Sequence, residues 1–154
     1  ASAFGATVGG GTKNEATSSS ATIGGGRYNT ASGMYSTIGG GGSGMSGNTA
    51  NAYAATISGG TGNYAGGMSG LSTVGGGQNN TASGSRSVVS GGSNNTSSSY
   101  YSVVGGGNSN TSSGSKSTVG GGASNTASGN YSVFNNWWWY GELSFFSKIK
   151  YFRR

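Results

Sequence analysis

Single β-branched residues, each followed by small residues and usually by glycines, recur along this chain at a nearly constant interval. Six of the eight steps between them are 15 residues long, and the other two are 19 and 17 residues long. A fixed period of this kind is the sequence signature of a repeat architecture. We call these positions the core anchors, and they are Val8, Ile23, Ile38, Ile57, Val74, Val89, Val104, Val119 and, at the end of the series, Phe134.

An asparagine follows almost every anchor at a distance of six residues; after Ile38 it comes ten residues later. The two long steps are therefore local insertions, of four residues within 39–47 and of two residues within 63–72. Register is recovered after both insertions, which a disordered low-complexity chain has no reason to do. The asparagine column consists of Asn14, Asn29, Asn48, Asn63, Asn80, Asn95, Asn110 and Asn125.

Each repeat contains two short segments with β-like alternation, of the types Ser-Thr-Val-Gly and Asn-Thr-Ala-Ser-Gly. Because successive side chains of a strand point to opposite faces, the anchor and the serine two residues before it share the inner face. In the second segment the asparagine and the small residue two positions later point inward. The threonines between these positions point outward.

Glycine-rich corners join the segments, since glycine adopts positive φ without a Cβ clash. Such coils stack so that each strand pairs with its equivalent about 4.8 Å above and below. Stacked asparagines can then bond each other's side-chain amides along the rod. The sequence predicts an all-β fold: a β-solenoid (β-roll) of about eight 15-residue coils over residues 1–134, with two short strands per coil.

The repeat is most complete in TIGGGRYNTASGMYSTIGGG (22–41) and TVGGGASNTASGNYS (118–132). These stretches resemble the head repeats of trimeric autotransporter adhesins, whose short coils carry a Ser-x-apolar-x-Gly and Ala-x-Gly pattern. The similarity spans residues 8 to 134, and similar repeats occur in phage tail fibres. The resemblance implies a left-handed β-roll, assembly as a trimer, and binding to extracellular matrix or to other cells.

The last segment, 135–154, differs abruptly in composition and holds all three tryptophans of the chain. Alternation of apolar and polar residues from 143 onward predicts an extended strand with one apolar face. An open solenoid end needs a cap, so this segment is expected either to cover its own last coil or to join another subunit by strand addition. A membrane-surface or sorting-signal role also stays open. The predicted capping or assembly residues are Trp137, Trp138, Trp139, Tyr140, Leu143, Phe145, Phe146, Ile149, Tyr151 and Phe152.

The chain lacks the residue types that most catalytic and metal sites need. It contains no His, Cys or Asp, and its two carboxylates, Glu15 and Glu142, lie in different regions. We therefore expect no enzyme activity, no metal and no cofactor. The formal net charge is +6, but the basic residues are scattered, so no nucleic-acid partner is expected. No apolar run is long enough to span a membrane as a helix.

These patterns lead to three functional hypotheses. The first is a non-catalytic structural or adhesive protein at the cell surface or outside the cell. It would associate with itself as a filament or a trimer and could contact matrix or cell-surface ligands. The second is ice binding through the outward threonine columns. The third is a segment of a phage or virion fibre, which relies on the same physics.

Overall fold

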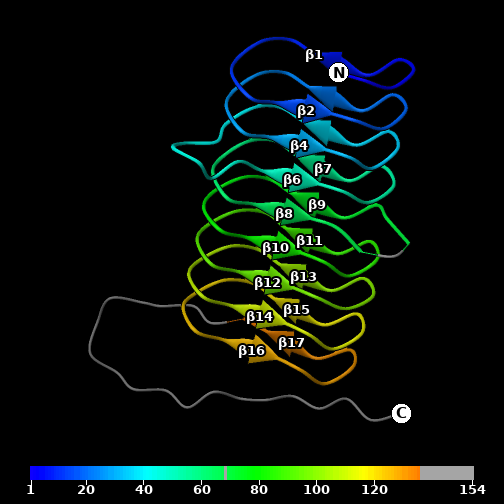
Figure 1. Ribbon diagram of the computed structural model, residues 1–154. Helices are drawn as coiled ribbons and strands as arrows, with labels where there is room; N and C mark the ends of the chain where they lie inside the picture. Colours follow the sequence, from blue (N-terminus) through cyan, green and yellow to red (C-terminus); the bar gives the residue numbers. More distant parts are fainter. Residues whose placement is uncertain (68, 136–154) are drawn as a thin grey trace.

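The computed structural model describes residues 1–67 and 69–135, which wind into a rod of stacked coils (Figure 1). All regular elements in this part of the chain are two-residue strands, and they form two parallel sheets. The nine-stranded sheet contains β1 (Thr7–Val8), β3 (Thr22–Ile23), β5 (Thr37–Ile38), β7 (Thr56–Ile57), β9 (Thr73–Val74), β11 (Val88–Val89), β13 (Val103–Val104), β15 (Thr118–Val119) and β17 (Val133–Phe134). The eight-stranded sheet contains β2 (Glu15–Ala16), β4 (Thr30–Ala31), β6 (Thr49–Ala50), β8 (Tyr64–Ala65), β10 (Thr81–Ala82), β12 (Thr96–Ser97), β14 (Thr111–Ser112) and β16 (Thr126–Ala127).

Successive coils pair in register through the backbone. Val89 stands beside Val104, and Val104 stands beside Val119. Backbone bonds of 2.7–3.1 Å link strand ends in the same way, for example from the N–H of Val103 to the carbonyl of Ser117. The predicted parallel β-solenoid of about eight coils is confirmed.

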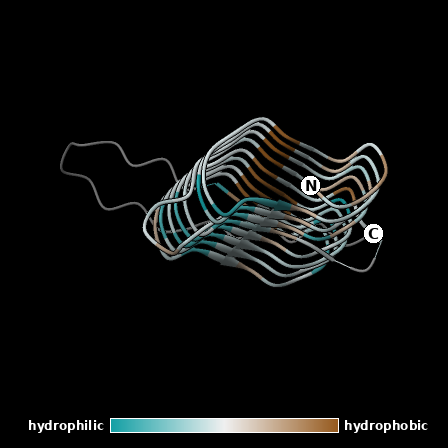
Figure 2. Ribbon diagram, turned by 45° about the horizontal axis from the view of Figure 1, so that its top comes forward, coloured by the Kyte–Doolittle hydropathy of each residue, from teal (hydrophilic) through white to brown (hydrophobic). Residues whose placement is uncertain are grey.

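The interior is narrow, with the β-branched anchors on one wall and small residues and asparagines on the other. The anchors from Ile23 to Val119 are fully buried, whereas Val8 and Phe134 at the ends of the series are only partly buried. Apolar residues run along one wall as a continuous brown band (Figure 2). Small residues and asparagines occupy the inward positions of the eight-stranded sheet. A core of this kind buries little apolar surface per coil, so the backbone hydrogen bonds carry much of the stabilisation.

The two insertions lie at opposite corners of the coil. The four-residue insertion extends the connection between β5 and β6, where the backbones of Ser43 and Ser46 bond each other and Met45 is exposed. This connection projects beyond its neighbours in Figure 1. The two-residue insertion lies between β8 and β9. Pairing resumes after both, since Thr56 stands beside both Thr37 and Thr73.

The C-terminal segment lies almost wholly outside the described residues, which end at 135. The predictions for its tryptophans and for the strand from 143 onward therefore stay predictions. In the part of the chain that is described, no helix has the length and apolar character needed to cross a membrane.

Candidate functional surfaces

Each coil has two corners, which differ in construction. We call the connection from an odd-numbered strand to the next even-numbered strand the glycine corner. We call the connection from an even-numbered strand to the next odd-numbered strand the turn corner. Both repeat along the rod, so each forms a long edge.

The glycine three residues after each anchor from Val8 to Val119 is held in a conformation that excludes a side chain, and we call it the third glycine because it takes the third position of the glycine corner. Gly92 has a φ of 87°, and a Cβ added there would lie 2.1 Å from the carbonyl oxygen of Gly107 in the next coil. Gly26 and Gly107 show the same geometry. By contrast, a Cβ on Gly91, the middle glycine, would meet nothing within 4 Å. A Cβ on the first glycine of a corner would also lie close to the next coil, but Ser58 and Ser90 occupy that first position in their own coils. Of the three positions, only the third combines close backbone approach with positive φ, and it is glycine in every coil.

The asparagine column closes the glycine corner from inside. Asn95 donates its side-chain amide to the carbonyls of Gly91 in its own coil and Gly107 in the next, both at 2.9 Å. Its Oδ1 accepts the backbone N–H of Asn110 at 2.9 Å. The same backbone-to-side-chain bond joins every consecutive pair from Asn14 to Asn125.

The ladder differs in part from the sequence expectation of amides bonded to amides. Direct bonds between side-chain amides join Asn29 to Asn14, and they join the pairs from Asn80 to Asn125. The continuous link is the one from each side-chain oxygen to the next backbone N–H. The amide nitrogens mainly donate to glycine carbonyls: the Gly107 carbonyl also accepts the N–H of Ser93, whereas the Gly91 carbonyl depends on Asn95. Each asparagine side chain from Asn14 to Asn110 thus bonds the glycine corner of its own coil and the glycine corner of the next coil.

The turn corner is a four-residue turn whose third residue has positive φ. In residues 99–102 the N–H of Ser102 donates to the carbonyl of Ser99 at 3.1 Å, and Tyr101 has a φ of 53°. Type II turns favour Gly or Asn at this third position. Here the residues at that position are Gly5, Ser20, Tyr35, Ala54, Leu71, Arg86, Tyr101, Lys116 and Tyr131.

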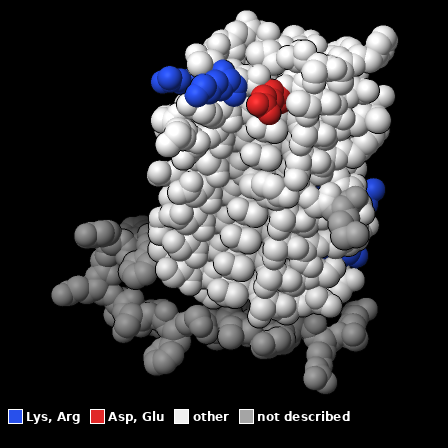
Figure 3. All heavy atoms as spheres, in the orientation of Figure 1, with Lys and Arg blue, Asp and Glu red and all other residues white. Residues whose placement is uncertain are grey.

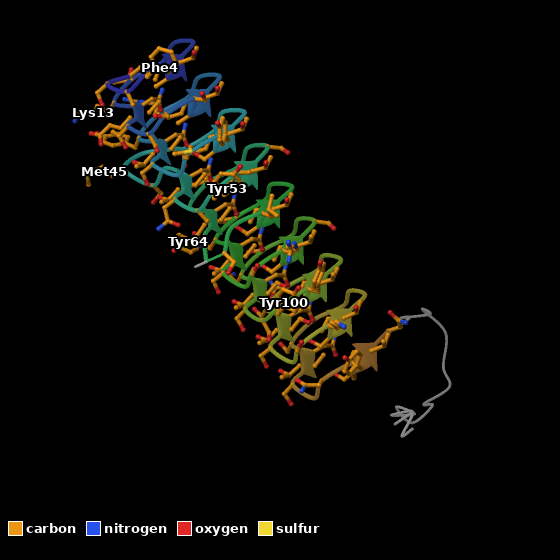
Figure 4. All side chains as sticks on the ribbon, turned by 90° about the vertical axis from the view of Figure 1, so that its right-hand side faces the viewer. Phe4, Lys13, Met45, Tyr53, Tyr64 and Tyr100 are labelled. Atoms are coloured by element: carbon orange, nitrogen blue, oxygen red, sulfur yellow. The ribbon has the colours of Figure 1, made fainter. Side chains whose placement is uncertain are left out.

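Large side chains at the turn corner lie on the surface and contact one another. Arg86 lies over the rings of Tyr100 and Tyr101, at 5.9 Å and 5.3 Å from the ring centres. Lys116 lies 5.0 Å from the centre of the Tyr131 ring. The labelled residues Phe4, Tyr53 and Tyr100 follow one another along the rod in Figure 4. The turn corner thus presents aromatic and cationic groups at intervals of one coil.

The inward serines behind the turn corner fall into two groups. Ser102 bonds the hydroxyl of Ser97 at 2.7 Å, and Ser117 bonds that of Ser112 at 2.6 Å. Ser87 has no hydrogen-bond partner among the described residues, and the opposite strand places Ala82 rather than a serine there. The buried hydroxyl is therefore satisfied only where the small residue opposite is also a serine.

The outer faces of both sheets carry threonine ladders. On the nine-stranded sheet Thr7, Thr22, Thr37, Thr56 and Thr73 are consecutive neighbours, followed by Val88 and Val103. On the eight-stranded sheet Tyr64 separates Thr49 from an unbroken ladder of Thr81, Thr96, Thr111 and Thr126.

Charged groups are sparse on the described surface. Figure 3 shows basic side chains at the edges of one face and a single acidic side chain near its N-terminal end. Glu15 on β2 is the carboxylate concerned, as Glu142 lies outside the described residues. Within 1–67 and 69–135 no three residues of the types His, Cys, Asp and Glu come together as a metal-binding group.

Sequence reasoning missed the turn corner as a distinct surface. A signal was present, because large residues recur immediately before the inward serines, as in Tyr35, Arg86 and Tyr101. No protein-family model matches the chain, and no curated protein matches its sequence. The fold alone defines its class as a parallel β-solenoid repeat protein.

Proposed function

We propose that this chain is a non-catalytic structural subunit that builds fibres at or outside the cell surface, by joining rods end to end. The observation that carries the proposal is that, among residues 1–67 and 69–135, the first and last strands of the nine-stranded sheet each pair on one side only. In the described part of the chain, β1 pairs only with β3, and β17 pairs only with β15. Open sheet edges are templates for pairing with another chain.

The two open edges are complementary in their backbone groups. In a parallel sheet the N–H and C=O of one residue point to the same neighbouring strand. The N–H of Thr7 donates to Ala21 in the second coil, so the groups of Val8 face away from the rod. At the other end, Phe134 accepts from Gly120, so the groups of Val133 face outward. A second copy placed on Val133 can therefore repeat the bonding that joins Thr118 to the last coil.

The aromatic C-terminal segment is proposed to contribute to this joint. Its tryptophans and phenylalanines are typical of buried subunit contacts. Trimeric assembly, as in the adhesins that the repeats resemble, is the other arrangement that the same rod could support. A phage or virion fibre would use the same joint.

Electron microscopy and sedimentation of the full chain test the proposal. We expect filaments whose thickness matches one rod, and we expect their loss on deletion of 137–154. Val8→Pro provides a second variant, because proline removes an N–H that faces the joint rather than the rod. Filaments that persist in both variants would contradict the joint, and discrete trimers of unchanged mass would favour the adhesin-like arrangement instead.

Ice binding is the second candidate function, and the unbroken ladder from Thr81 to Thr126 favours it. Serines stand two residues after these threonines on the same outer face, so hydroxyls recur about 4.8 Å apart along the rod and about 6.6 Å apart across it. Such a regular hydroxyl lattice could order water. The serines are Ser83, Ser98, Ser113 and Ser128.

Thermal hysteresis of monomeric chain tests this second candidate. Thr96→Tyr with Thr111→Tyr should abolish the activity without disturbing the fold, because Tyr64 already occupies the same column. Thr118→Val is the matched control, since Val88 and Val103 stand in its column. A wild-type chain without thermal hysteresis would rule out ice binding.

A further inference from the structure

Four consecutive turn corners place a cation and a tyrosine alternately at the same position. Arg86, Tyr101, Lys116 and Tyr131 each occupy the third residue of the turn, and Tyr100 precedes Tyr101. We call these five residues the cation–tyrosine column. Each cation lies over a tyrosine ring of the following coil. The column forms one strip along the C-terminal half of the rod.

These residues occupy strained positions without a compensating burial. Their φ angles run from 53° to 60° at the four alternating positions, a region that bulky residues rarely adopt. Tyr101 is 44% exposed and Tyr131 is 69% exposed. Glycine or asparagine would suit the turn better, so folding does not account for the large side chains. Strain retained at an exposed position points to a role in binding.

Backbone bonds and ring packing hold the column in a fixed arrangement. The N–H of Tyr101 donates to Ser85, that of Lys116 to Tyr100, and that of Tyr131 to Ser115, at 2.8–3.1 Å. These bonds fix each turn on the turn before it. Tyr100 and Tyr101 pack edge to face with ring centres 4.3 Å apart. Rigid rings offer contact area at a low cost in conformational entropy.

The chemistry of the column selects a linear and anionic partner. Arg86 and Lys116 carry positive charge, and the carboxylate of the described residues, Glu15, lies near the other end of the rod. The exposed tyrosine faces can stack on flat apolar faces that recur along a polymer. Two cations are few for a nucleic acid, whose binding rests on many phosphate contacts. We propose that the cation–tyrosine column binds an anionic polysaccharide, with tyrosines against sugar rings and cations against carboxylate or sulfate groups.

The first test measures binding of the full chain to polygalacturonate by titration calorimetry at low and high salt. We expect saturable binding that weakens with salt and no comparable binding to neutral dextran. Absence of binding, or equal binding to dextran, would overturn the proposal. Tighter binding to single-stranded poly-dT or to vesicles containing an anionic lipid would also overturn it, because the partner class would then be different.

Two double variants locate the site. Arg86→Gln with Lys116→Gln should weaken binding at least about tenfold, the loss expected when two charge-assisted hydrogen bonds are removed. Tyr101→Asn with Tyr131→Asn should weaken it similarly while the melting temperature stays the same or rises, since Asn suits positive φ.

The control is Lys13→Gln with Tyr28→Asn, which removes the same chemistry from the glycine corner. There Lys13 lies 4.9 Å from the ring centre of Tyr28, and both residues have positive φ. This variant should bind as the wild type does, and a loss equal to that of the column variants would contradict the proposed site. The joint variant Val8→Pro should bind normally per chain, so failure of fibre assembly and failure of this inference are distinguishable.

Discussion

Both corners of each coil carry the chain from one sheet to the other, but they differ in how the backbone is held. At the glycine corner backbones approach so closely that a Cβ on Gly92 would overlap the next coil, and Asn95 fills the space inside. At the turn corner the chain reverses through a turn fixed by backbone bonds, and its third residue points into solvent. The third-glycine and asparagine positions of the glycine corner therefore admit few residue types, whereas the third position of the turn corner admits residues from glycine to tyrosine.

This difference separates residues that define the fold from residues that are available for function. Glycine and asparagine recur at the glycine corner because backbone contacts require them. The backbone bonds that Tyr101 and Lys116 make to the turn before them do not require their large side chains. Positions that hold the same residue in every coil are thus required by the fold. Exposed positions whose residue differs between coils are available for binding.

The largest effect is expected at the third glycine. Gly92→Ala should lower the free energy of unfolding by about 4 kcal/mol or more, since it combines a positive φ with overlap against a carbonyl. The Gly107 carbonyl cannot move away easily, as it accepts the N–H of Ser93 at 2.9 Å. Urea denaturation measures the change. Gly91→Ala next to it should change stability by less than about 1 kcal/mol, and equal losses in the two variants would contradict the glycine-corner geometry.

A somewhat smaller loss is expected in the asparagine column. Asn95→Ala leaves the N–H of Asn110 and the carbonyl of Gly91 without this partner, and it removes one of the two hydrogen bonds to the Gly107 carbonyl. The loss should cost about 3 kcal/mol. The exposed neighbour Asn94 bonds only Ser93 through its side chain, and its φ of 56° suits glycine. Asn94→Gly should therefore be nearly neutral. Thermal melting of the two variants side by side provides the comparison.

The inward serines of the turn corner should respond with opposite signs. Ser102→Ala removes a hydroxyl that bonds Ser97 and Ser99, so we expect a loss of about 1 kcal/mol. Ser87→Ala removes a buried hydroxyl that has no partner among the described residues, so stability should rise by about 1 kcal/mol. Ala21 and Ala55 already occupy equivalent positions. Destabilisation by both variants would show that Ser87 has a partner.

The smallest effect is expected on the outside of the turn corner. Tyr101→Asn should change the free energy of unfolding by no more than about 0.5 kcal/mol, because its ring is exposed and asparagine tolerates positive φ. Chemical denaturation monitored by circular dichroism measures it. A loss above about 2 kcal/mol would assign the tyrosine a structural role and remove the main argument for a binding surface.

Most of the fold could be predicted from the sequence, because a 15-residue period indicates which residues stand side by side in adjacent coils. The anchors and the asparagine column together placed the two insertions within 39–47 and 63–72, and the strands at Ile38, Ile57 and Val74 pair in register around them. The sequence could not distinguish the middle glycine from the third, since the letters are the same and only the approach of the next coil differs. It also could not predict whether an inward serine finds a partner, which depends on Ser97 or Ala82 in the opposite strand.

The candidate surfaces were harder to predict than the fold. Glycine or asparagine usually marks the positive-φ position of a turn in a sequence. Arg86 and Tyr131 occupy that position here, so the sequence pattern did not reveal the turn. The asparagine column was recognised from its spacing, but the bond from side chain to backbone depends on how far each coil rises. This bond between coils forms only once the coils are stacked, so the sequence alone does not reveal it.

Engineered disulfides test the stacking of the coils most directly, since the chain has no cysteine of its own. Thr96→Cys with Thr111→Cys should oxidise readily, because neighbouring strands lie about 4.8 Å apart, within disulfide range. Thr37→Cys with Thr56→Cys should do the same although these residues are 19 positions apart, whereas Thr96→Cys with Thr126→Cys, two coils apart, should stay reduced. Oxidation of the last pair as fast as the others, or failure of the pair at 37 and 56, would contradict the stack.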